Sequence, residues 1–311
     1  MKAKYPGIGL EGLCGLFGMT GNAWHHRRKR KECAGPDHTG EVLEMVKVLR
    51  KRQCRLGTPK LYEHLKPSLE AMGIKMGRNS LNELLQSHGM GIRQRKGRIR
   101  TTDSSHGRPT YPNLAAGLEP DGPHQLWVGD ITYLRRKRGG FFFLILLTDA
   151  YSHMVVGWNV SMTMTAEDCM VALDMALGQL PQEHSLIHHT DRGGQYIDEE
   201  YVKKLTDRGI RISMTESGDP RENPVAERMN GILKHELGLK QEFGSLQQAR
   251  TAAGEAIAIY NRERLHSSCD YMTPEKAHQA TGPLRKRWKN LRKERAMMKR
   301  KAEEENANGP A

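Results

Sequence analysis

The sequence predicts an α/β protein in which a mixed sheet of five strands carries helices on both faces, preceded by a small all-helical region. Residues 1–91 repeat apolar side chains at helical spacing, whereas residues 125–282 alternate strand and helix patterns. Residues 92–124 are basic, contain four prolines and show no hydrophobic period, so we expect a linker there. Residues 283–311 are first basic and then acidic, which predicts a partly disordered tail.

The first segment has the outline of a helix-turn-helix. Leu13, Leu16 and Phe17 recur at helical spacing, residues 18–20 break the period, and residues 22–30 resume as a strongly basic helix. A helix, a short turn containing glycine and a basic helix are typical of proteins that place a helix in the major groove of DNA.

Three further helices are expected before residue 91. We expect Thr58 to be the N-cap of the second, with Pro59 at its first helical position. In the third, Ser80 and Glu83 have the spacing of a capping box, and Gly89 ends the helix.

Basic side chains flank these helices and continue into the linker. This pattern favours DNA binding over the alternative, a helical protein-interaction module with a solvated basic face. The candidates for DNA contacts in this part of the chain are Lys60, Arg78, Arg93 and Lys96.

The order of elements after residue 125 predicts the topology of the sheet. Three strands joined by short turns form an antiparallel meander, and two further strands alternate with helices. The strands are expected at residues 125–133, 141–148, 154–160, 185–189 and 210–214, and the helices at 165–177, 198–207, 225–239 and 246–260. A meander followed by crossover units is the outline of a ribonuclease-H-like fold.

The composition favours a polyanionic partner and argues against a membrane protein. The formal net charge is +13, and each Lys or Arg that neutralises a phosphate releases counterions and adds affinity. The longest apolar run, residues 141–147, is far shorter than a membrane-spanning helix. Five scattered cysteines without a Cys-x-x-Cys pair fit reduced thiols, so we expect a cytoplasmic protein.

Three carboxylates are placed where a sheet of this kind collects functional groups. Asp130 lies on the first strand, Asp191 follows the fourth strand, and Glu227 lies near the start of the helix after the fifth. Hard divalent cations select carboxylate oxygens, and two such ions can stabilise the attacking and the leaving oxygen of a phosphodiester. The three acids therefore predict a catalytic site for Mg²⁺, with Mn²⁺ as a substitute.

Three other acids are weaker candidates. Asp149 follows a strand but is explained equally well by a turn, and Asp174 belongs to a helix pattern. Glu222 precedes Asn223-Pro224 in a loop and ranks second to Glu227.

Polar residues near the three acids are candidates for holding DNA. Lys234 follows Glu227 by seven residues, two helical turns, so both share one helix face. Of His188 and His189, we expect one to pack in the core and His189 to position DNA. Arg192 and Asn223 complete this group, and for Lys234 an ordinary exposed helix lysine is an equally good interpretation.

The sequence resembles the integrase-core transposases of bacterial insertion sequences, specifically the OrfB product of the third insertion-sequence family. The matching motifs are residues 125–133, 189–196 and 223–227, then Tyr260-Asn261-Arg262-Glu263-Arg264-Leu265-His266 with Thr273-Pro274. The 35 residues between Asp191 and Glu227, and the position of Lys234, also fit the family. One departure is Glu222-Asn223-Pro224, where the family usually has Asp-Asn-Ala.

This resemblance implies a ribonuclease-H-like fold, metal binding by Asp130, Asp191 and Glu227, and copy-out transposition through DNA strand cleavage and transfer. It also implies binding to terminal inverted repeats and target DNA as a homo-oligomer. It further implies an upstream-frame product that supplies another DNA-binding and oligomerising segment. Because this chain begins without a leucine-zipper pattern, we expect it to be the downstream product alone. The alternatives are an inactive or regulatory DNA-binding relative and a ribonuclease-H-like nuclease that cuts without joining.

Overall fold

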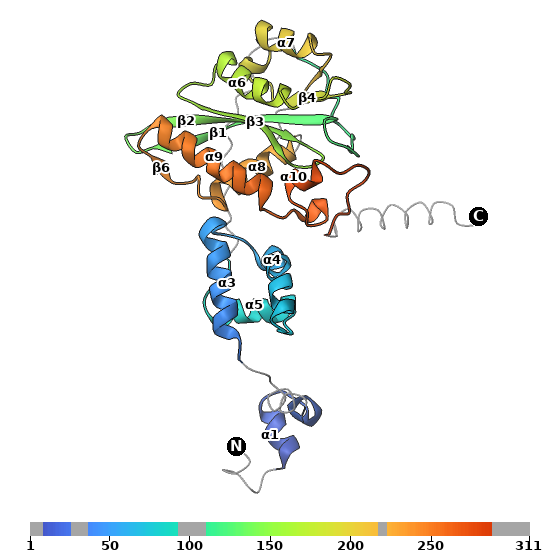
Figure 1. The fold of residues 1–311 in the computed structure, drawn as a ribbon. Coiled ribbons are helices and arrows are strands. Elements are labelled where there is room, and N and C mark those ends of the chain that lie inside the picture. Colours follow the sequence, from blue (N-terminus) through green and yellow to red (C-terminus); the bar gives the residue numbers. More distant parts are fainter. Residues whose placement is uncertain (1–8, 26–36, 93–109, 217–222, 288–311) are drawn as a thin grey trace, which may run out of the picture. The chain divides into compact units, whose positions relative to one another are not determined.

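A computed structural model describes residues 9–25, 37–92, 110–216 and 223–287 (Figure 1). Arg93, Lys96 and Glu222 lie outside the described residues. The chain divides into two compact units, residues 1–46 and 47–311, so the boundary falls inside a helix and not after residue 91 as expected. The reason is that residues following this boundary contact the rest of the second unit, as the ion pair Arg52–Glu263 at 2.7 Å illustrates.

Near the N-terminus the described residues contain a helix, a break and the start of a second helix. Helix α1 spans Leu10–Leu16, the break falls at Gly18 with φ +63°, and residues 21–25 are helical again. The expected apolar face was wrong in part: Leu13 is buried, but Leu16 and Phe17 are 75% and 58% exposed. The remainder of the basic helix, residues 26–30, lies outside the described residues.

The three expected helices are α3 (Thr39–Arg52), α4 (Thr58–Ala71) and α5 (Arg78–Ser87). Two expected caps were wrong, because α4 begins one residue and α5 three residues earlier than expected, after Gly57 and Gly77 in extended conformation. Thr58 and Ser80 are therefore already inside the first turn and cannot cap it. The expected end of α5 at Gly89 is confirmed, because Gly89 follows the helix with φ +67°.

The predicted mixed sheet is confirmed. Its strands are β1 (Leu126–Arg136), β2 (Phe141–Asp149), β3 (Val155–Ser161), β4 (Ile187–Thr190) and β5 (Arg211–Met214). The spatial order is β3-β2-β1-β4-β5, with antiparallel pairing from β1 to β3 and parallel pairing of β4 with β1 and β5. The sequence missed a two-residue strand, β6 (Glu242–Phe243), which pairs with the end of β1.

Helices cover both faces of the sheet, as Figure 1 shows. On one face α6 (Ala166–Leu177) and α7 (Glu199–Thr206) bury Trp127 and Leu147; on the other, α8 (Pro224–His235) and α9 (Leu246–Arg262) bury Leu134 and Leu146. This arrangement is a ribonuclease-H-like fold.

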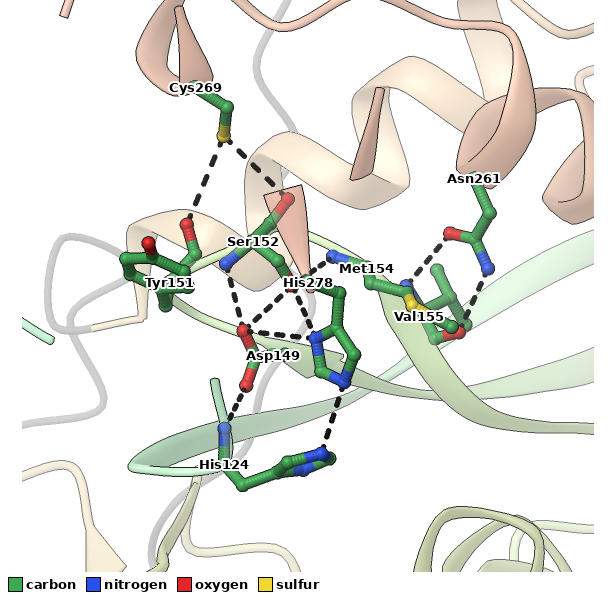
Figure 2. Close-up of polar contacts among 9 residues, drawn as sticks. All are labelled: His124, Asp149, Tyr151, Ser152, Met154, Val155, Asn261, Cys269 and His278. Atoms are coloured by element: carbon green, nitrogen blue, oxygen red, sulfur yellow. Dashed lines mark hydrogen bonds and ion pairs between the residues drawn. The ribbon is translucent and has the colours of Figure 1, made fainter. Parts of the chain in front are cut away.

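The segment after α9 is fastened to the turn between β2 and β3 by buried polar contacts (Figure 2). Asp149 accepts hydrogen bonds from the backbone N–H groups of His124 and Ser152, both at 2.8 Å. Ser152 in turn hydrogen-bonds to Nδ1 of His278 at 2.9 Å, next to the short helix α10 (Pro274–Ala277). The alternative that Asp149 serves a turn is therefore the correct one.

A second buried contact joins this segment to the end of α8. Arg264, which is 1% exposed, donates to both carboxylate oxygens of Glu236 at 2.8 and 3.1 Å and contacts Nε2 of His266 at 2.7 Å. Burial alone would raise the pKa of Glu236, but the hydrogen bonds and charge of Arg264 lower it overall. Residues of the C-terminal signature thus hold the helix that begins with Pro224.

The approach of α6 to the sheet depends on the absence of a side chain at Gly157 of β3. A Cβ atom there would lie 2.1 Å from the backbone oxygen of Ala172. Gly231 in α8 differs, because nothing lies within 4 Å of a Cβ atom added to it.

We expect Gly157→Ala to lower the free energy of unfolding by about 1–3 kcal/mol or more, because backbone atoms of α6 must move. Gly231→Ala is the matched control and should raise it by about 0.5–1 kcal/mol through helix propensity. Thermal unfolding of both variants measures the difference. Equal melting temperatures for the two would contradict the packing described here.

Candidate active site

The pairing of β1 with β4 brings Asp130 and Asp191 to neighbouring positions. The two strands are parallel, with Val128 opposite His189. Continuing this register by two residues sets Asp130 against Asp191, and neighbouring strands lie about 4.8 Å apart. Two acids that are distant in sequence are therefore adjacent at the end of β4.

The backbone before Asp130 is packed tightly from two directions. A Cβ atom on Gly129 would approach Thr190 Cγ2 to 3.0 Å and His188 Cε1 to 3.3 Å. The carbonyl oxygen of Gly129 accepts a hydrogen bond from Nδ2 of Asn223, at the start of α8, at 3.1 Å. These contacts fix the strand at the position from which the Asp130 carboxylate projects.

Asp130 carries an unfavourable charge in this position. Burial, and then the negative charge of Asp191, raise the pKa of Asp130 to about 7, and Glu227 adds a smaller contribution. Hydrogen bonds from the Ile131 N–H and the Asn230 amide act in the opposite direction. Helix α8 thus presents both an acid and an amide toward Asp130.

Sequence reasoning missed Asn230. It follows Glu227 by three residues and precedes Lys234 by four, so the three share one helix face. Lys234 is partly buried, which lowers its pKa, while the charge of Asp130 acts to raise it. The i, i+3, i+7 spacing from Glu227 was the signal that could have identified Asn230.

Of the other two acids, Asp191 acts more strongly on the pKa of Asp130 than Glu227 does. Glu227 is exposed, and within the described ranges no three His, Cys, Asp or Glu side chains are close enough to hold a metal ion. The residues nevertheless fit a hard cation. Asp130 and Asp191 bring negative charge into a partly buried position, and a cation would offset the burial and the repulsion by Asp191 that raise the pKa of Asp130.

Two residues expected to contact DNA are buried instead. His189 is 1% exposed and hydrogen-bonds through Nδ1 to Ser213 Oγ at 2.8 Å, and Asn223 is 8% exposed and holds Gly129. Both expectations were wrong, because these side chains connect strands and helices inside the fold. His188 also packs in the core, as expected, with Nε2 2.9 Å from the hydroxyl of Tyr201 and a pKa that burial lowers to about 3.

The remaining candidates differ in their environment. Arg192 is partly buried and donates from Nε to the Thr215 carbonyl at 2.8 Å. Burial, and then the charge of Arg264, lower the pKa of Lys60 to about 7, so it is a poor phosphate ligand in this structure. Arg78 is exposed at the start of α5.

The described part of the expected linker is attached to the core. Leu114 N–H donates to Ser213 Oγ at 2.8 Å and the Pro112 carbonyl accepts from the Met214 N–H at 3.4 Å, so residues 112–114 lie beside β5. None of the helices in the described part of the chain has the length and hydrophobicity needed to cross a membrane.

Comparison with known proteins identifies the class. Residues 120–220 and 208–274 match two families that are both described as integrase core domain. The fold and these matches define a polynucleotidyl transferase that acts on DNA.

Full-length relatives then give the family. The chain is 31% identical over 276 residues to the transposase InsF of insertion sequence IS3A from Escherichia coli (strain K12), which covers 86% of this chain and 92% of that protein. An uncharacterized 31 kDa protein of insertion element IS600 from Shigella sonnei is 30% identical over 275 residues, covering 86% and 99%. The chain belongs to the integrase-core transposases of the IS3 insertion-sequence family.

Solved structures with a similar fold include two from viruses. The catalytic core domain of HTLV-2 integrase, in complex with magnesium, is 22% identical with a TM-score of 0.41, covering 50% of this chain and 97% of that one. A chain of the simian T-cell lymphotropic virus intasome in complex with the PP2A regulatory subunit B56 gamma is 20% identical with a TM-score of 0.45, covering 74% of this chain and 73% of that one.

We expect Asp130→Asn to stabilise the metal-free protein in a pH-dependent way. Folding raises the pKa of Asp130 from 3.8 to about 7, so this carboxyl costs stability increasingly as the pH rises from about 4 to about 7, and the cost is constant at higher pH. In EDTA at pH 8.5 the variant should melt a few degrees higher than wild type, and the gain should shrink toward pH 5.5. Asp174→Asn, which removes an exposed ion pair with Lys204, is the control and should show no such gain. A gain in melting temperature that is independent of pH would contradict the raised pKa of Asp130.

Proposed function

We propose that this transposase cleaves and joins DNA strands with Asp130, Asp191 and Glu227 as the ligands of catalytic Mg²⁺, for which Mn²⁺ can substitute. The observation that carries the proposal is the juxtaposition of Asp130 and Asp191 in the β1–β4 register, with the pKa of Asp130 raised to about 7. Glu227 is included because its charge reaches Asp130 from α8.

The protein's own side chains prepare this site for a phosphodiester. Asp130, Asp191 and Glu227 would hold the divalent ions, which would supply stabilisation of the charge on the attacking and leaving oxygens of phosphoryl transfer. Asn230 donates to Asp130 and orients that carboxylate, while Lys234 on the same helix face supplies a cation for a neighbouring phosphate. His188 remains neutral in the core and supports β4 without taking part in proton transfer.

The organisation around this core follows from the same proposal. The DNA-binding region comprises residues 1–91 and the catalytic core residues 125–282, and terminal inverted repeats and target DNA are the substrates. Arg78, Arg192, Arg93 and Lys96 remain candidates for phosphate contacts. A homo-oligomer on DNA and an upstream-frame product complete the assembly in this proposal, as the resemblance implies.

Substitution of one carboxylate tests the catalytic assignment. With duplex DNA carrying the element end and Mg²⁺ present, Asp191→Asn and Glu227→Gln should each lower nicking and strand joining by at least about two orders of magnitude. Retention of the same DNA in EDTA should stay near wild type, because neither change removes a cation. Asp174→Asn is the matched control outside the site and should keep full activity.

The outcomes separate the alternatives. Tight DNA binding by wild type without any nicking in Mg²⁺ or Mn²⁺ would identify an inactive or regulatory relative. Cleavage of an RNA–DNA hybrid without strand joining would identify a nuclease of the ribonuclease H type. Full activity of Glu227→Gln would remove that residue from the proposed ligands.

A further inference from the structure

The hairpin that joins β1 to β2 projects past the site with an unusual concentration of positive charge. Residues 135–138 read Arg-Arg-Lys-Arg, and Arg135, Lys137 and Arg138 are exposed. We call residues 135–140 the basic tip. In the described part of the chain, these three cations form no ion pair. Their charge is therefore available to a partner.

The backbone of the basic tip is fixed. Gly139 and Gly140 take positive φ values of 84° and 76°, which a turn of this kind requires of glycine. Strand β6 pairs alongside the end of β1, and the N–H of Lys137 donates to the Phe243 carbonyl at 3.0 Å. Because the turn is already ordered, little backbone entropy is lost when its cations bind a ligand.

Aromatic side chains stiffen the two strands that carry the tip. Tyr133 lies opposite Phe143 in the register, and its ring centroid is 5.4 Å from both Phe143 and Phe141. On the other face, the guanidinium of Arg136 lies over the ring of Phe142 at 5.2 Å. Cross-strand aromatic pairs and this cation–π contact stabilise the hairpin beyond the edge of the main core.

The basic tip lies beyond Asp130 along β1, past the ends of the neighbouring strands. Strand β4 ends at Thr190, beside Asp130, and β5 ends at Met214, whereas β1 continues to Arg136. At about 3.3 Å per residue, the tip begins roughly 17 Å beyond Asp130, which is the length of about five base pairs of duplex. A duplex held at the carboxylates therefore has a length of backbone within reach of the tip.

We propose that the basic tip binds the phosphate backbone of duplex DNA outside the catalytic site, through Arg135, Lys137 and Arg138. Charge complementarity favours DNA over a protein partner, because the tip itself contains four cations and no acid. Glu242, opposite Arg135, is the one acid in the strand pairings of the tip. The contact reads no sequence, because exposed cations on a turn bind phosphates and not base edges. The inference rests on the proposed strand-transfer function only in that this function places the duplex at the carboxylates.

Salt dependence measures the contact directly. We compare Lys137→Gln/Arg138→Gln with a matched control, Lys203→Gln/Arg208→Gln, which removes the same charges from exposed positions in and after α7. Binding of full-length protein to duplex DNA is followed by fluorescence anisotropy at several salt concentrations in EDTA. The slope of log affinity against log salt should fall by about 1.8 for the tip variant, about 0.9 per lost phosphate contact, and stay unchanged for the control.

The loss should be similar for element-end DNA and for unrelated duplex, since phosphate contacts are independent of sequence. An unchanged slope for the tip variant, or an equal fall in the control, would overturn the proposal. An unchanged slope with loss of self-association in sedimentation would assign the tip to a second copy of the chain instead. Cleavage is not needed for this measurement, so a protein that binds through the tip but never nicks would refute only the catalytic proposal.

Discussion

The parallel pairing of β1 with β4 is the constraint on which the candidate site depends. Because side chains alternate between the faces of a strand, a shift of one residue would turn Asp130 away from Asp191. Gly129 permits the observed register, since a side chain there would collide with Thr190 and His188. The sheet thus holds two carboxylates together, and burial together with the charge of Asp191 raises the pKa of Asp130.

Helix α8 is held at both of its ends. At its start, Asn223 donates to the Gly129 carbonyl next to Asp130; just past its other end, Glu236 pairs with the buried Arg264. Between these anchors lie Glu227, Asn230 and Lys234 on one face. Their positions relative to β1 are therefore set by contacts at the two ends of the helix. The C-terminal signature around Arg264 gains a physical role from this arrangement, as part of the support of α8.

The residues that the motifs suggested for DNA contact and the exposed positive charge lie in different parts of the fold. His189 and Asn223 lie in the most family-like segments, yet both are buried and connect secondary structure elements. The basic tip lies outside the residues chosen for DNA contact, and its cations are exposed on an ordered turn. Residues near a catalytic motif can serve to hold the backbone, and the surface charge that meets DNA can lie some distance along the same strand.

The sequence alone determined the class of fold and the candidate acids. Periodicity of two and of 3.6 residues reports local structure, so it predicted the five strands, their order along the chain and the helices between them, to within a few residues. Helix starts at Gly57 and Gly77 were missed because glycine gives no side-chain capping signal. Strand β6 was missed because two residues are too few for any pattern.

The tertiary structure alone decided which residues face one another. Only pairing across β1 and β4 sets Asp130 beside Asp191, and only packing against β5 shows that His189 is inside. The hydrogen bond of Asn230 to Asp130 joins residues 100 positions apart, and no local pattern encodes such a contact. Distances between remote segments depend on strand register and helix packing, which a one-dimensional pattern does not contain.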